Sequence, residues 1–178
     1  MVGKCTRLFT TDVQVGDIID LLNGVRSALV GDYPVSKPGL AIGTTATNVA
    51  NDAFDYNIGG VRYTKAAVAA GTAPGNDVIP EDTYGAVAFD IDAAGTITAV
   101  EAPDNATGYA SAALAVAALP AVAANKARMG WVTATSSSGA FTFGTTDLDA
   151  ANTTVAYTDG DAGLETIGSA IADIPSIV

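Results

Sequence analysis

The sequence contains no histidine and a single cysteine, Cys5, among its 178 residues. Without histidine, a Ser-His-Asp triad, a Cys-His pair and a histidine-based metal site cannot be assembled. One cysteine cannot form a disulfide within the chain, so non-covalent interactions must hold the fold together. These two absences exclude the commonest forms of nucleophilic and zinc-dependent catalysis.

Basic residues are also scarce, because 8 lysines and arginines face 19 acidic residues and give a formal net charge of −11. A chain this acidic repels phosphate backbones and anionic lipid, so we expect neither nucleic acid nor a membrane as a partner. The apolar run Ala110–Ala124 is broken by Pro120 and is too short to span a bilayer. The first residues lack the continuous apolar segment of a signal peptide, and we expect a soluble protein made in the cytoplasm.

Aromatic residues make up only 7% of the chain, and alanine supplies much of its 49% apolar content. Alanine buries little area, so we expect a thin core built on valine, isoleucine, leucine, phenylalanine and tyrosine. The 19 glycines, together with many threonines, aspartates and asparagines, favour turns and strands. The composition predicts a mainly β protein of one domain with terminal extensions.

A β-hairpin is the strongest local prediction, with Gly59 and Gly60 in its turn. This register places Ile58 opposite Val61 and Tyr56 opposite Tyr63. One face of the hairpin is then apolar and requires a core or a partner. The apolar face comprises Phe54, Tyr56, Ile58, Val61 and Tyr63, and the polar face Asp55, Asn57, Arg62 and Thr64.

Further strand patterns follow along the chain. Tyr84–Val100 predicts a second hairpin with a turn at Asp92–Gly95, and Asn152–Thr158 predicts a short strand. Arg128–Ser136 predicts a strand with Met129 and Thr133 on the face of Trp131, and Val132 and Ala134 on the other face. A turn at Ser136–Gly139 leads into Ala140–Phe143, which we expect to pair back. We expect a linker at Asp32–Pro38, a long mobile loop at Val68–Pro80, and either a short helix or an extended crossover at Tyr109–Leu119.

These patterns predict an antiparallel β-sandwich or barrel of about six to seven strands, with short helical segments at both termini. The expected organisation is an N-terminal arm and helix over residues 1–38, a β domain over residues 39–158 and a C-terminal tail over residues 159–178.

Both terminal segments carry apolar residues at alternating spacings of three and four, which is typical of one face of a helix. These stripes either pack on the core of the same chain or contact a neighbouring subunit. The N-terminal stripe comprises Val15, Ile18, Leu22, Val25 and Leu29, and the C-terminal stripe Leu164, Ile167, Ile171, Ile174 and Val178.

Several strand-and-turn segments occur in a particular order between Gly39 and Ala150. They are GLAIGTT at 39–45, YNIGGVRYTKAA at 56–67, FDIDAAGTITAV at 89–100, ALPAVAANKARMGWV at 118–132 and FTFGTTDLDA at 141–150. This succession resembles structural proteins of tailed bacteriophages, of the capsid decoration (cement) or head-fibre type. The resemblance implies a structural protein of the virion, on the outside of the capsid, with the major capsid protein as its partner.

Paired carboxylates are the remaining candidates for chemistry. Two aspartates spaced i, i+2 share one face of a strand, or bind Ca²⁺ from a turn with carbonyl oxygens. They could also serve a glycosidase, but no aromatic-rich sugar cleft accompanies them. We interpret them as turn-forming residues and expect no metal, no cofactor and no catalysis. The pairs are Asp90/Asp92, Asp147/Asp149 and Asp159/Asp161.

Three functions remain open. The first is a protein that binds a phage capsid as a homotrimer and stabilises it by bridging capsid subunits. The second is a fibre or receptor-binding adhesin module, and the third is a hydrolase that uses an acidic pair. For the first function, the candidate contact residues are Ile18, Leu22, Val25, Leu29, Tyr56, Tyr63, Ile167, Ile171 and Ile174.

Overall fold

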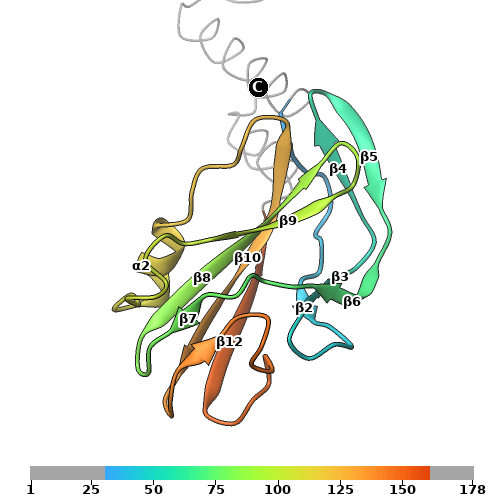
Figure 1. Ribbon diagram of the computed structural model, residues 1–178. Coiled ribbons are helices and arrows are strands. Elements are labelled where there is room, and N and C mark those ends of the chain that lie inside the picture. The colour runs from blue at the N-terminus through green and yellow to red at the C-terminus, as the bar shows by residue number, and fades with distance from the viewer. Residues whose placement is uncertain (1–30, 161–178) are drawn as a thin grey trace, which may run out of the picture.

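The structure, a computed structural model, describes residues 31–160, which form a mainly β region with one short helix (Figure 1). The helix is α2, Ala112–Ala117. The strands are β1 (Tyr33–Pro34), β2 (Ala41–Ile42), β3 (Val49–Asn51), β4 (Phe54–Ile58), β5 (Val61–Lys65), β6 (Val68–Thr72), β7 (Val78–Ile79), β8 (Tyr84–Asp92), β9 (Ile97–Glu101), β10 (Lys126–Ser136), β11 (Phe141–Thr142) and β12 (Thr153–Asp159). The mainly β prediction is confirmed.

The strands of this region form several small antiparallel sheets. The largest has four strands in the order β12-β10-β8-β9, and its two long central strands run through the middle of the molecule in Figure 1. Two three-stranded sheets have the orders β1-β4-β5 and β2-β3-β6, and β11 pairs with β7. The structure thus has more strands than the sequence predicts, because many of them are only two or three residues long.

The first predicted hairpin is confirmed residue for residue. Ile58 pairs with Val61 and Tyr56 with Tyr63 across β4 and β5. Gly59 and Gly60 occupy the turn with φ values of 58° and 79°, a region that glycine adopts without the steric cost of a Cβ. The local turn chemistry therefore fixes the register of this hairpin.

The second hairpin, β8 to β9, is confirmed as well. The Oδ1 atom of Asp92 accepts hydrogen bonds of 2.9 Å from the backbone N–H groups of Ala94 and Thr96. Asp92 is therefore a turn-forming aspartate, as predicted. Val87, Phe89 and Ile91 point from β8 into the core.

A β-bulge interrupts β10 and overturns one prediction. The pairing of β10 with β8 shifts between Arg128 and Gly130, so Met129 is an extra residue on β10. A bulge inserts one residue and moves the following side chains to the opposite face. Met129 consequently joins Val132 in the core rather than lying on the face of Trp131.

The main core lies between the four-stranded sheet and the first hairpin. One cluster of buried side chains joins Phe54 and Tyr56 of β4 to Phe89 of β8 and Val132 of β10. The helix α2 covers the opposite face of β8, where Ala115 packs with Ala86. In Figure 1, α2 and the β4–β5 hairpin accordingly lie on opposite sides of β8 and β10.

Of the two alternatives predicted for Tyr109–Leu119, a short helix or an extended crossover, the structure shows the helix. The Ser111 side chain accepts a hydrogen bond from the backbone N–H of Leu114 and caps its N-terminus. The helix ends at Ala117, three residues before Pro120. Within residues 31–160, no helix is long and apolar enough to cross a membrane.

Three of the loop and pairing predictions are wrong. Val68–Pro80 contains β6 and β7 and is not a structureless loop. Phe141 pairs with Ile79 of β7 rather than back on β10, and the expected linker contains β1, which pairs with β4. In each case a distant strand supplies hydrogen bonds that the local sequence does not reveal. The two terminal apolar stripes lie outside the described residues.

Candidate interaction surface

The β4–β5 hairpin carries the two predicted contact residues that the structure describes, Tyr56 and Tyr63. Tyr56 is only 1% exposed and Tyr63 is half-buried. Their rings stack with centroids 5.5 Å apart and planes inclined by 25°. Tyr56 is thus a core residue, and only Tyr63 of the pair offers surface to a partner.

The buried end of Tyr56 fastens the hairpin to the rest of the molecule. Its hydroxyl donates a hydrogen bond of 3.1 Å to the carbonyl oxygen of Asp92, in the turn of the second hairpin. Lys65 Nζ donates a hydrogen bond of 2.7 Å to the carbonyl oxygen of Gly95 in the same turn. Burial raises the pKa of Tyr56, and the nearby Asp92 and Tyr63 raise it further. One face of the hairpin is therefore held rigidly.

The outer face of the hairpin carries a surface polar network centred on Asp55. Arg62 and Thr64 each donate a hydrogen bond of 2.6 Å to its carboxylate. The Thr64 and Arg62 hydrogen bonds lower the pKa of Asp55, so it stays ionised at neutral pH. An open depression lies beside this network and is lined by Ser36, Ala53, Phe54, Asp55 and Thr64.

One large apolar side chain next to the turn of the hairpin is open to solvent. Val61, the first residue of β5, is 53% exposed although it is a large aliphatic residue. The backbone N–H of Gly59 donates a hydrogen bond of 2.6 Å to Asp32, which holds the turn from the other side. The turn therefore presents an exposed valine on a fixed backbone.

The other exposed large apolar residues of the described region lie on β2, on β7, on α2 and in the segment between α2 and β10. They are Ile42, Val78, Leu114 and Val122. Isolated apolar residues are common on protein surfaces, and none of these four carries a functional argument by itself.

Comparison with known proteins gives no match: no family model, no curated protein and no solved structure is significantly similar to this chain.

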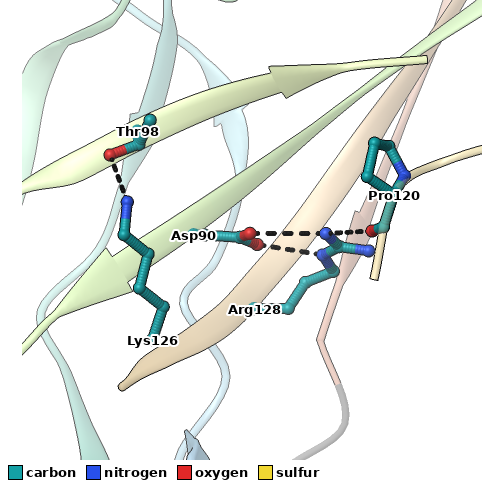
Figure 2. A network of polar contacts seen from close by, with 5 residues as sticks. All are labelled: Asp90, Thr98, Pro120, Lys126 and Arg128. Carbon is teal, nitrogen blue, oxygen red and sulfur yellow. Dashed lines mark hydrogen bonds and ion pairs between the residues drawn. The ribbon is translucent and has the colours of Figure 1, made fainter. Parts of the chain in front are cut away.

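Asp90 is the one buried acidic residue in the described region and thus the first carboxylate to consider for catalysis. Arg128 on β10 donates hydrogen bonds of 2.9 Å to its Oδ1 and 3.3 Å to its Oδ2, and a third of 2.8 Å to the carbonyl of Pro120 (Figure 2). Lys126, two residues away on β10, donates to the Thr98 hydroxyl on β9. The carboxylate is thus held by a bidentate ion pair with Arg128.

Two aspartates of the predicted acidic pairs, Asp92 and Asp147, take part in turns. Asp92 is committed to its turn, and the carbonyl of Asp147 accepts a turn hydrogen bond from Ala150. Burial raises the pKa of Tyr157, and the nearby Asp149 raises it further. From Gly31 to Gly160, no three acidic, cysteine or histidine residues come together as metal ligands. Asp161 lies outside the described residues.

The Asp90–Arg128 pair was not predicted from the sequence. Asp90 follows Phe89 on β8 and therefore points away from the core, towards the face that α2 and the chain after it cover. An acidic residue within the second face of a long apolar strand is the signal that could have indicated a buried basic partner.

Proposed function

We propose that this chain is a structural protein of a tailed-bacteriophage virion that binds the outside of the capsid as a homotrimer. It bridges subunits of the major capsid protein and has no catalytic role. Two observations support this proposal. The order of the strand-and-turn segments between Gly39 and Ala150 resembles that of capsid decoration and head-fibre proteins. The described residues form the mainly β region expected for such a protein.

The observation that carries the proposal is the construction of the β4–β5 hairpin. Tyr56 and Lys65 fix the hairpin to the neighbouring turn, while Val61 remains 53% exposed beside it. A rigid apolar contact loses little conformational entropy on binding, so it favours recognition of a partner surface. An exposed valine at an ordered turn is therefore suited to docking on another protein.

Stabilisation of the shell follows from mass action. A ligand that binds the assembled capsid more tightly than the separated subunits shifts the equilibrium towards the assembled state. Apolar area buried at each contact contributes about 25 cal/mol per Å², and the loss of translational and rotational freedom offsets part of it. A trimer with three equivalent contacts reduces that loss, because the second and third contacts form within a bound molecule.

We also propose that the small sheets together form an antiparallel sandwich, with attachment segments at both ends of the chain. The main core cluster, which β4, β8 and β10 share, supports this arrangement. The terminal stripes, from Ile18 to Leu29 and from Ile167 to Ile174, are proposed as helical contacts with capsid or neighbouring subunits.

The decisive experiment measures this polypeptide in purified phage heads. A decoration protein is present in many copies, in a fixed ratio to the major capsid protein, and raises the temperature at which heads break. Val61→Asp is expected to weaken binding to undecorated heads. Val78→Asp is the matched control, because Val78 is 46% exposed on a different strand.

Two experimental outcomes would contradict the proposal. Few copies per particle, together with antibodies that block adsorption to cells, would assign the chain to a receptor-binding fibre instead. Equal binding of the Val61→Asp, Val78→Asp and unmodified proteins would remove the hairpin from the contact. Circular dichroism of both variants checks that each is folded.

A further inference from the structure

The strand β12 forms an outer edge of the four-stranded sheet. All seven of its residues, Thr153–Asp159, pair with β10 on one side. No other strand of the described region pairs with its opposite side. A strand in this position presents a row of backbone donors and acceptors that a further strand can use.

The hydrogen bonds at its two ends show which groups face outwards. The carbonyl of Asn152 accepts a hydrogen bond from Ser137, and the N–H of Gly160 donates one to Met129. Backbone groups of alternate residues point to opposite edges of a strand, so the even-numbered residues face β10. The N–H and C=O groups of Val155, Tyr157 and Asp159 therefore point away from the sheet.

The β12 edge lacks the features that protect two other edge strands of the described sheets, β5 and β1. Proteins protect edges with charged side chains, with proline or with short strands. The edge strand β5 carries Arg62 and Lys65, and the two-residue β1 contains Pro34. On β12 the only charged residue is the last one, Asp159.

The side chains of β12 are also compatible with a close neighbour. Thr154, Ala156 and Thr158 are small, uncharged and exposed on one face, while Val155 and Tyr157 pack partly against the core on the other. A neighbouring strand would meet no bulky or charged group on the exposed face, so backbone approach is unobstructed.

We propose that β12 pairs antiparallel with β12 of a second copy of this chain, with Ala156 facing Ala156 across a twofold axis. Val155 of each copy then faces Tyr157 of the other. The outward N–H group of each of these residues donates a hydrogen bond to the outward C=O group of the other. Thr154 faces Thr158, so every opposed pair except the last is uncharged. The register satisfies the alternation of the backbone groups without a bulge.

The position of Asp159 allows a second copy of this chain to occupy the edge. In the proposed register Asp159 faces Thr153, and the two Asp159 carboxylates lie six residues apart along the strands. At about 3.4 Å per residue this is roughly 20 Å, well beyond the screening length of about 8 Å at physiological ionic strength. Each Asp159 also accepts a hydrogen bond of 2.8 Å from the N–H of Leu40 of its own chain, which holds its carboxylate in place. Two strongly acidic molecules can therefore meet at an uncharged contact.

The β12 contact is separate from the proposed capsid contact and from the proposed trimer. Identical edges that face one another are related by a twofold axis, whereas a trimer requires a threefold axis. The β12 contact would thus join copies from two neighbouring trimers. Loss of this contact would leave binding to the capsid through the β4–β5 hairpin intact.

Cysteine crosslinking of the full chain tests the register. In a Cys5→Ser background, Ala156→Cys places two thiols at a non-hydrogen-bonded pair, where Cα atoms are about 4.5 Å apart and a disulfide can form. Thr158→Cys is the matched control, since it lies on the same exposed face but its two copies would be about 14 Å apart. After mild oxidation, Ala156→Cys is expected to run mainly as a covalent dimer on a non-reducing gel and Thr158→Cys mainly as single chains.

Two results would overturn the proposal. One is equal crosslinking of the two variants, which indicates random collision. The other is an Ala156→Cys thiol that fails to crosslink, which indicates that another segment, such as residues 161–178, covers the edge.

As a second measurement, Ala156→Lys is expected to lower self-association in sedimentation experiments, because it places two like charges opposite one another. Ala93→Lys in the β8–β9 turn is the control and is not expected to change self-association. Binding to heads, measured in parallel, tests the capsid proposal independently.

Discussion

Arg128 on β10 lies directly opposite Asp90 on β8 and holds both oxygens of its carboxylate. The Asp90 side chain is 2% exposed and the Arg128 side chain 18% exposed. The same guanidinium binds the carbonyl of Pro120 and so attaches the segment after α2 to the sheet. The Asp90–Arg128 pair is placed beside the bulge at Met129, where the regular pairing of β8 and β10 is interrupted.

Arg128→Met is expected to destabilise the protein by about 3 kcal/mol, because removal of one partner leaves a buried carboxylate uncompensated. Urea denaturation measures the change in the free energy of unfolding. Lys126→Met is the control on the same strand, since it removes a single surface hydrogen bond, and we expect a change within about 0.5 kcal/mol. Equal effects of the two substitutions would show that the Asp90–Arg128 pair contributes no more than a surface contact.

Gly130→Ala is expected to be far more disruptive than Gly59→Ala. Gly130 has a φ of 152°, and a Cβ there would collide with the backbone carbonyl of Thr158. Gly59 also has a positive φ, but a Cβ there would meet no atom within 4 Å. We expect Gly59→Ala to cost about 1 kcal/mol from backbone strain alone, and Gly130→Ala at least about 3 kcal/mol from strain and overpacking together. Thermal and urea unfolding of both variants give the comparison, and similar costs would contradict it.

Asp77→Asn is expected to stabilise the protein at neutral pH. Burial and the nearby Glu101 carboxylate raise the pKa of Asp77, although a hydrogen bond from Asn105 lowers it. A carboxyl whose folded pKa exceeds its unfolded value of 3.8 contributes stability below that value and loses it as the pH rises through the folded pKa. The neutral amide avoids the cost at pH 7, so the gain of Asp77→Asn should shrink as the pH falls towards about 4.

Unfolding measured across this pH range tests the expectation for Asp77. Asp104→Asn, at an exposed position in the loop after β9, provides a control for a general change in net charge. A stabilisation by Asp77→Asn that does not depend on pH would contradict the titration argument.

Leu22→Asp and Ile171→Asp test the proposed attachment role of the terminal stripes. If these residues contact capsid or neighbouring subunits, each substitution lowers the affinity for heads or the oligomer size, while the stability of the β region is unchanged. Asn23→Asp and Ser169→Asp add the same charge next to the stripes and serve as controls. A large drop in unfolding temperature would instead place the stripes in the core of the chain.

Both hairpins were predictable from the sequence because their information is local. The Gly59-Gly60 pair and the Asp92–Gly95 turn fix the register of the strands on either side. The strands β6 and β7 were not predictable, since their glycine-, alanine- and proline-rich segment becomes extended only by pairing with β3 and β11. Propensity is a weak guide where a distant partner supplies the hydrogen bonds.

The candidate site was predictable only in part. The apolar face of the first hairpin followed from the alternation of its residues, but whether Tyr56 or Tyr63 would be covered depends on the sheet packed against them. The face of Met129 could not be predicted, because a bulge breaks the period of two on which the prediction relies. The Asp90–Arg128 pair could not be predicted, because these two residues are 38 positions apart in sequence and meet only through the register of β8 and β10.

Tyr56 and Lys65 join the first hairpin to the turn of the second at two separate carbonyl groups, those of Asp92 and Gly95. The strands of the first hairpin cannot separate from the turn of the second without breaking both hydrogen bonds. The two hairpins should therefore open as one cooperative unit, and amide hydrogens of β4 and of the residues around Gly95 should exchange with deuterium at matched rates.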